Sequence, residues 1–336
     1  MRFNQEKKNS IILYVLEKID SGTDSLSRSV SEAFGVNQAT IHTYITELIE
    51  QGIIKKTKRG QYELVDQVYD YCLEKKDWMF DIDTYVYDNY LSEHIKDLPE
   101  NVKHIWNYVC SEMFNNVIEH SEAGKCNIRI IQNRLNTTMI LDDDGIGIFK
   151  KIRDHFRLPT LEDAITELVK GKLTTDSNNH SGEGIFFSSK MMDDFYIVSE
   201  EKVFSINKYD DSKIFDGSYD NARGTTVIMR LSNNSKKTCK DIFDQYSDEN
   251  SSFMKTRIPL ASIYDSYPVS RSQAKRLCNR LEDFKEVVLD FADVDWMGQG
   301  FAHQLFVVFA RDHQDVLLTP INMSEDVLKM YKHVKA

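Results

Sequence analysis

The stretch Ser111-Glu112-Met113-Phe114-Asn115-Asn116-Val117-Ile118-Glu119-His120 decides the fold of the central part of this chain. Glu112, Asn116 and His120 recur at intervals of four residues, so they share one face of a predicted helix. The apolar residues between them hold that helix against a core. A carboxylate can position or deprotonate a water, and an amide oxygen can ligate a hard cation. Such a pair alone is more common at a solvated helix edge, so its meaning depends on the motifs that lie C-terminal to it.

Three glycine motifs lie C-terminal to this stretch, and the first two would bring backbone close to a ligand. Asp143-x-Gly145-x-Gly147 comes after an alternating apolar run that predicts a strand over residues 138–141. The two glycines allow a sharp turn, and Asp143 can accept a hydrogen bond from an exocyclic amine. Gly182-x-Gly184 opens a predicted helix, whose first backbone amides can cradle phosphate oxygens.

The third motif is Gly224-Thr225, which enters a predicted strand. Each motif alone also fits an ordinary turn or a loop-to-helix junction. Their order, E-x-x-x-N, D-x-G-x-G, G-x-G and G-T, resembles the N, G1, G2 and G3 boxes of the GHKL superfamily of ATPases. The resemblance covers residues 77–235. The pattern Ser-Glu-x-x-x-Asn-x-x-x-His at residues 111–120 is most similar to the anti-sigma kinase branch.

The resemblance implies a Bergerat α/β sandwich that binds ATP and Mg²⁺. It assigns the role of general base to Glu112, a Mg²⁺ ligand to Asn116 and the adenine contact to Asp143. It also implies an ATP lid over residues 149–181 with a helix over 161–170. Lys170, Lys172 and the Thr-Thr-Asp-Ser-Asn-Asn tract at residues 174–179 are open alternatives for phosphate contact. His120 is more typical of a structural residue than of a ligand. The remaining implied site residues are Gly145 and Gly147 at the base, Gly182 and Gly184 at the phosphates, and Thr225 under Asp143.

Residues 1–66 predict three helices followed by a hairpin. Apolar residues recur at helical spacing, Gly22 and Gly35 end two helices, and Asn37 is a suitable N-cap for the third. The pattern resembles a winged helix-turn-helix domain, whose third helix enters the major groove while the wing contacts phosphates. A protein-docking winged helix with a solvated basic tip is the alternative. The resemblance implies base contacts by Gln38, Thr40 and Thr43, and phosphate contacts by Lys55, Lys56, Lys58 and Arg59.

Residues 255–332 predict alternating strands and helices. A short apolar strand over residues 286–291 leads through a turn into a helix over 301–309, and Ser270 can cap an earlier helix. This arrangement resembles a STAS-type domain, the module of anti-sigma-factor antagonists. In those antagonists a serine in the turn accepts phosphate, whereas the turn here, Met297 to Phe301, has no hydroxyl. A plain α/β packing domain is the alternative.

The composition of the chain excludes several classes of protein. The chain has 336 residues and a net charge of −11, which disfavours a protein coated with nucleic acid but allows one small DNA-reading module. Its five cysteines form no C-x-x-C pair, and the odd number fits reduced thiols. No apolar run is long enough to cross a bilayer, and no signal peptide is recognisable. We therefore expect a cytoplasmic protein without a membrane partner.

These observations predict a multidomain α+β protein built from a winged helix, a Bergerat sandwich and a STAS-like domain. Its expected function is that of a regulator in which ATP binding and slow Mg²⁺-dependent hydrolysis control the binding of double-stranded DNA or a protein partner. The alternative is a serine/threonine kinase of the anti-sigma type acting on a partner protein. An ATP sensor without turnover is a third hypothesis, which the presence of Glu112 disfavours. A homodimer is compatible with each of these functions.

Overall fold

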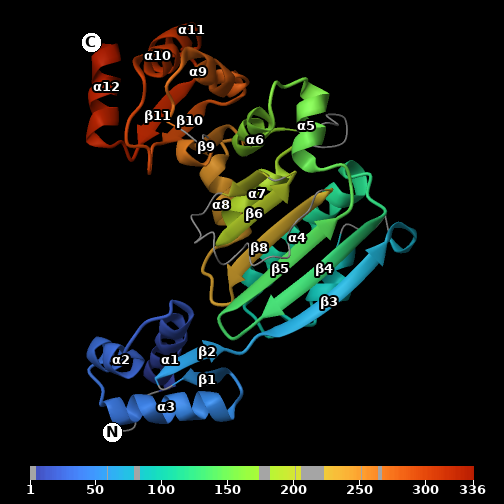
Figure 1. Ribbon diagram of the computed structural model, residues 1–336, viewed down its shortest axis with the longest axis vertical. Coiled ribbons are helices and arrows are strands. Elements are labelled where there is room, and N and C mark those ends of the chain that lie inside the picture. The colour runs from blue at the N-terminus through green and yellow to red at the C-terminus, as the bar shows by residue number, and fades with distance from the viewer. Residues whose placement is uncertain are drawn as a thin grey trace.

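The computed structural model describes residues 5–58, 60–78, 84–173, 182–200, 202–205, 223–250, 252–263 and 267–336. Within these ranges the chain is a mixed α/β protein with three separate sheets of two, six and three strands. The sheets follow one another along the chain, and each has its own helices (Figure 1). We call the three parts the N-terminal, central and C-terminal units.

The N-terminal unit has three helices and a two-stranded hairpin, as the sequence predicted. The second helix ends at Gly35, which adopts a left-handed φ of +61°. The third begins where Asn37 Oδ1 accepts a hydrogen bond from the amide of Ala39. The hairpin is antiparallel and turns at Gly60. The elements are α1 (Gln5–Asp20), α2 (Leu26–Phe34), α3 (Gln38–Glu50), β1 (Ile54–Lys58) and β2 (Gln61–Leu64).

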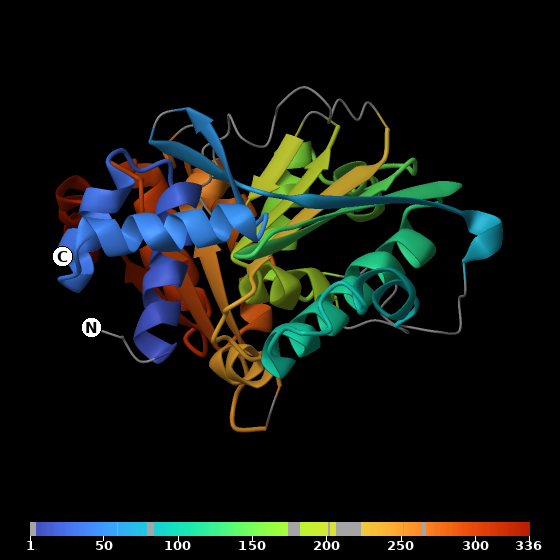
Figure 2. The ribbon, with the colours of Figure 1, turned by 90° about the horizontal axis from the view of Figure 1, so that it is seen from below.

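The central unit is built on a six-stranded antiparallel sheet in the order β3-β4-β5-β8-β6-β7. The long helix α4 (Glu100–His120) crosses one face of the sheet and buries an apolar stripe against it (Figure 2). The helix α7 (Gly184–Met191) packs beside α4. The strands are β3 (Gln67–Glu74), β4 (Lys125–Gln132), β5 (Asn136–Asp143), β6 (Asp194–Ser199), β7 (Lys202–Ser205) and β8 (Thr225–Ser232).

Shorter helical elements complete the central unit. One of them, α6 (Leu161–Lys170), has the bounds that the sequence predicted and begins where Thr160 Oγ1 accepts from the amide of Asp163. The others are η1 (Lys75–Asp77), the π-helix η2 (Tyr87–Leu91), α5 (Ile148–Phe156) and α8 (Cys239–Tyr246).

The C-terminal unit has a parallel three-stranded sheet in the order β11-β10-β9. Its first helix is capped reciprocally by Ser270 and Gln273, as the sequence suggested for Ser270. The predicted helix over 301–309 is divided into α10 (Gln299–His303) and the π-helix η6 (Gln304–Phe309). The other elements are β9 (Lys255–Pro259), η4 (Leu260–Ser262), α9 (Arg271–Cys278), η5 (Leu281–Asp283), β10 (Glu286–Asp290), α11 (Ala310–Asp312), β11 (Leu317–Ile321) and α12 (Glu325–Lys335).

Within the described ranges, the units contact one another at two places. Leu135, in the turn between β4 and β5, is buried in the core of the N-terminal unit, and Arg230 on β8 pairs with Asp20 at 2.7 Å. At the other end, α6 lies between the central sheet and the C-terminal unit (Figure 1). The central and C-terminal units share one continuous hydrophobic core. Among the described helices, none has the length and apolarity needed to span a bilayer.

Candidate functional site

The predicted site residues meet at one cleft between α4, α6 and the loops at the ends of β5 and β8. Its inner part is a cavity of about 90 Å³ with largely apolar walls. Asn116 and His120 come from α4, and Asp143, Gly147 and Thr225 come from the adjacent strand ends. The other lining residues are Met113, Val117, Ser121, Ile148, Lys151, Ile152, Leu168, Leu173, Ile185, Ile197 and Val227.

The outer part of the cleft has a volume of about 220 Å³ and more polar walls. Glu112 and Asn116 line it from α4, while Gly182 and Gly184 line it from the start of α7. Asn116 borders both parts, so the two cavities are neighbours along one helix face. Seven of the eight residues that the sequence assigned to an ATP site therefore line this cleft; the eighth, Gly145, lies in the adjoining turn.

Asp143 is the buried carboxylate of the inner part. Burial raises its pKa to about 6, although the amides of Gly145 and Thr225 donate hydrogen bonds that act in the opposite direction. Only 5% of the residue is exposed. A carboxylate in this position offers an acceptor for an N–H group of a ligand in the inner cavity.

The turn after Asp143 has no room for a side chain at either of its two glycines. A Cβ on Gly145 would lie 2.7 Å from Oδ1 of Asp143 and would overlap the backbone of Ser121. Gly147 has a φ of +81°, and a Cβ there would lie 2.7 Å from Oγ of Ser199. Both positions therefore require glycine, for close approach at the first and also for conformation at the second.

Thr225 fixes the same turn from β8. Its Oγ1 accepts a hydrogen bond from the amide of Ile148 at 3.0 Å, and it pairs with Asp143 across the sheet. Thr225 thus lies beside Asp143 and holds the first turn of α5 against the cavity. Nearby, Ser199 Oγ donates to the carbonyl of Gly224 at 2.9 Å, which secures the entry to β8.

Glycine is also required where α7 meets α4. A Cβ on Gly184 would overlap the carboxylate of Glu112, and Gly182 has a φ of +68° with the backbone of Leu173 directly against it. The start of α7 therefore lies in van der Waals contact with the face of α4 that carries Glu112 and Asn116. The outer cavity has the carboxylate, the amide and the first backbone amides of a helix on its walls.

The structure adds three residues that the sequence prediction did not include. Tyr108 lies one turn before Glu112, and burial, followed by the carboxylates of Glu112 and Glu183, raises the pKa of its phenol. Lys151 lines the inner cavity and donates to the carbonyl of His120 at 2.6 Å, with a pKa lowered by burial. The four-residue spacing from Glu112 could have indicated Tyr108. The spacing of residues along the sequence did not indicate that Lys151 or Glu183 would lie at the cleft.

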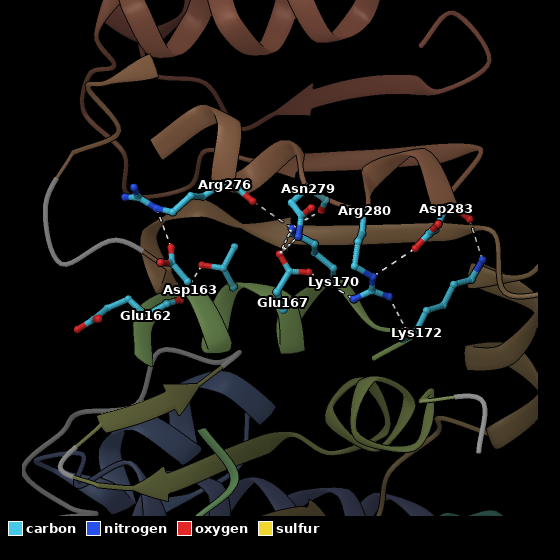
Figure 3. A network of polar contacts seen from close by, with 10 residues as sticks. Glu162, Asp163, Glu167, Lys170, Lys172, Arg276, Asn279, Arg280 and Asp283 are labelled. Atoms are coloured by element: carbon cyan, nitrogen blue, oxygen red, sulfur yellow. Dashed lines mark hydrogen bonds and ion pairs between the residues drawn. The ribbon is translucent and has the colours of Figure 1, made fainter. Parts of the chain in front are cut away.

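The helix α6 forms one wall of the cleft and also contacts the C-terminal unit. Leu168 lines both cavities, whereas Glu167 and Lys170 lie on the side of the helix that faces β9 and α9 (Figure 3). Lys170 is fully buried, and its Nζ donates to Glu167 Oε1 at 2.8 Å and to the carbonyl of Asn279 at 2.5 Å. Burial lowers the pKa of Lys170, while the Glu167 carboxylate acts in the opposite direction.

Arg276 and Arg280 extend this network across the boundary between the units. Arg276 Nε contacts Asp163 Oδ1 at 2.7 Å, and Arg280 Nη1 contacts Glu167 Oε2 at 3.3 Å (Figure 3). Lys172 Nζ donates to the carbonyl of Asp283 at 2.8 Å. Lys170 and Lys172, two of the candidates for phosphate contact, therefore have their amines bound to the C-terminal unit in this structure. Residues 174–181 of the expected lid lie outside the described residues.

The residues predicted to contact DNA lie on two surfaces of the N-terminal unit. Gln38 and Thr43 are exposed on α3, and Thr40 is partly exposed. Lys56 and Lys58 are exposed on β1, where Lys55 pairs with Glu63 at 3.1 Å. Arg59 lies outside the described residues.

Comparison with known proteins identifies one part of the chain. No curated protein matches the sequence. A family model described as a STAS-like domain of unknown function (DUF4325) matches residues 273–328, which run from α9 into α12. The C-terminal unit therefore contains a STAS-like domain, as its strand–turn–helix pattern predicted.

Proposed function

We propose that the central unit is a GHKL-type domain that binds ATP with Mg²⁺, and that its nucleotide state controls the two flanking units. The observation that carries the proposal is the convergence of four separate motifs on one cleft. Asp143 and Thr225 would contact the adenine, while Gly182 and Gly184 would approach the phosphates. Glu112 would orient the attacking water from the outer cavity.

The residues present fit a magnesium ion that is held together with a nucleotide. Within the described residues, no three carboxylate, histidine or cysteine side chains are grouped to hold an ion by themselves. Mg²⁺ in nucleotide sites is commonly held by one or two protein ligands together with phosphate oxygens. Asn116, which borders both cavities, is placed to supply such a ligand, and bound Mg²⁺ would neutralise charge on the phosphates.

Two contacts support a coupling between the cleft and the flanking units. The helix α6 presents Leu168 to the cleft and Lys170 to the STAS-like unit, so a ligand that moves α6 would change that interface. On the other side, β8 begins at Thr225 in the cleft and carries Arg230, which pairs with Asp20 of the N-terminal unit. We infer that the N-terminal unit is a winged helix that binds double-stranded DNA.

The test measures nucleotide binding first and DNA binding second. A fluorescent ATP analogue should bind the intact chain with Mg²⁺, and Asp143→Ala should abolish that binding. Glu112→Ala should retain binding and lose hydrolysis by about 10²-fold or more, as expected for removal of a general base. The DNA affinity of the intact chain should then differ with and without ATP, and Asn116→Ala should remove the difference. Absence of ATP binding by the intact chain would refute the proposal.

A serine/threonine kinase acting on a partner is the second candidate function. The observation that favours it is the partial exposure of Glu112, which would allow a hydroxyl from another protein to reach it. Incubation with γ-labelled ATP and candidate partners separates the two functions. Labelled protein would support the kinase, and free phosphate without labelled protein would support the ATPase.

A further inference from the structure

A second cavity lies between the central and STAS-like units, at the opposite end of α7 from the cleft. Its volume is about 290 Å³. Pro259 and Asp290, the last residues of the parallel strands β9 and β10, form one wall. Ser189 and Lys190, from the end of α7, line the cavity too. Ligands in open sheets of parallel strands commonly bind at the carboxyl ends of the strands.

Three cations and two carboxylates line this cavity, and both carboxylates already have strong donors. Asp290 accepts hydrogen bonds from the Arg257 guanidinium at 2.6 and 3.1 Å, from the amide of Ala292 and from Nδ2 of Asn322. Asp193 accepts from Lys237 Nζ and from the amide of Ser232, each at 2.8 Å. Arg257 is thus paired with Asp290, and Lys237 is paired with Asp193.

Lys190 is the cation that remains. Within the described part of the chain its amine makes no hydrogen bond or ion pair, and it lies over the rings of Phe186 and Tyr246 at 5.0 and 5.9 Å. Burial, with a smaller contribution from Arg257, lowers its pKa to about 8. The residue is partly exposed, and the charge of Asp290 favours the ammonium form of Lys190, but Asp290 is bonded to Arg257. An anion in the cavity would stabilise the ammonium further.

We propose that this cavity binds a small organic phosphate, with the phosphate group between Lys190 and Arg257. Arg257 has one terminal nitrogen, Nη1, that no carboxylate of the described residues occupies. Ammonium and guanidinium groups together suit a phosphate oxyanion, and the volume leaves room for an attached organic group. The site is separate from the ATP cleft and does not depend on the nucleotide proposal.

The helix α7 connects this cavity to the cleft. The helix α7 begins at Gly184, which borders the outer cavity of the cleft, and ends at Met191 beside Lys190. With 1.5 Å of rise per residue, Gly184 and Lys190 are about 9 Å apart along the helix axis. A phosphate at Lys190 would also join α7 to β9 of the STAS-like unit. The site is therefore placed where one ligand contacts both units.

The test uses equilibrium dialysis with glycerol 3-phosphate and inorganic phosphate at constant ionic strength, with glycerol as the uncharged control. The intact chain should bind both anions and not glycerol. Lys190→Met, which keeps the aliphatic stem, should weaken both affinities by about tenfold or more. Lys190→Arg should retain binding. Lys240→Met is the matched control, because Lys240 is an exposed lysine on α8 that pairs only with its helix neighbour Asp244.

A measurement on the unmodified protein keeps the proposal testable if Lys190→Met fails to fold. Acetylation of Lys190 by a mild reagent, followed by mass spectrometry, should slow in the presence of glycerol 3-phosphate, while that of Lys240 should not. Equal affinities of the parent and Lys190→Met for both anions would overturn the proposal. Equal acetylation of Lys190 with and without glycerol 3-phosphate would also overturn it.

Discussion

Gly184, at the start of α7, lies directly against the carboxylate of Glu112 on α4. A Cβ at position 184 would overlap Oε2 of Glu112 and lie 2.8 Å from its Cδ. The two residues are distant in the sequence, and their contact sets the width of the outer cavity. The position of the Glu112 carboxylate therefore depends on the absence of a side chain at residue 184.

Gly184→Ala should displace Glu112 and reduce ATP hydrolysis by at least about tenfold, a loss of about 1.4 kcal/mol in transition-state stabilisation. Alanine is the better helix former by about 1 kcal/mol, so reduced activity would come from the contact and not from helix propensity. Gly124→Ala is the matched control, since a Cβ there meets only Asp144 Oδ2 at 3.9 Å. Steady-state hydrolysis by the two variants makes the comparison, and an unchanged rate in Gly184→Ala would contradict the argument.

Asp143 should make both stability and nucleotide binding depend on pH. Its pKa rises from 3.8 to about 6 on folding, so the folded state binds more protons between these values. The free energy of unfolding should therefore fall as pH rises from about 4 through about 6, on the order of 2–3 kcal/mol from this group. Urea unfolding of the parent and of Asp143→Asn at several pH values isolates the contribution of Asp143 to the pH dependence of stability.

Nucleotide binding should show the opposite trend, because the adenine amine needs the ionised carboxylate as acceptor. Affinity for the fluorescent ATP analogue should weaken as pH falls through about 6, by up to about tenfold per pH unit. Lys151 and His120 are the other titratable side chains that line this cavity among the described residues, so the titration is repeated with His120→Gln. A pH-independent affinity would argue against contact between Asp143 and the nucleotide.

Lys170→Met should destabilise the chain strongly, because Glu167 and the carbonyl of Asn279 would lose a buried donor. Removal of one partner from a buried ion pair costs about 3–5 kcal/mol. Lys329→Met is the control, since Lys329 is an exposed lysine paired with Asp326 within one helix, and it should change stability by less than about 1 kcal/mol. Adding Glu167→Gln to the Lys170→Met variant should recover part of the lost stability if the two charges act as a pair.

Lys56 and Lys58 should contribute to DNA binding through phosphates and not through sequence. Replacing both by alanine should weaken binding to any duplex and lower the slope of log affinity against log salt by about 2. Electrophoretic mobility shifts at several salt concentrations measure the slope, with Lys329→Ala as the control for a lost surface charge. An unchanged slope would favour the alternative, in which the winged helix binds protein.

The sequence by itself determined the local structure. Helical spacing and turn residues gave α2 and α6 their bounds, because Gly35 and the Thr160 cap act over a few residues. The glycine motifs appeared where positive φ or close approach requires them, as at Gly147. The order of four motifs predicted which residues would share a cleft, because each motif is short and its residues are identifiable by type.

Only the tertiary structure decided which way α6 faces. Lys170 sits on a helix whose two sides both contact protein, and its amine is bound by the backbone carbonyl of Asn279, which no side-chain pattern reveals. The cavity around Lys190 likewise needs residues from α7, β9 and β10, which are separated by long intervals of sequence. Periodicity reports the neighbours of a residue along one element. Contacts between elements depend on how the sheets and helices pack. That packing assigned Lys170 to the interface and left Lys190 without an ion pair among the described residues.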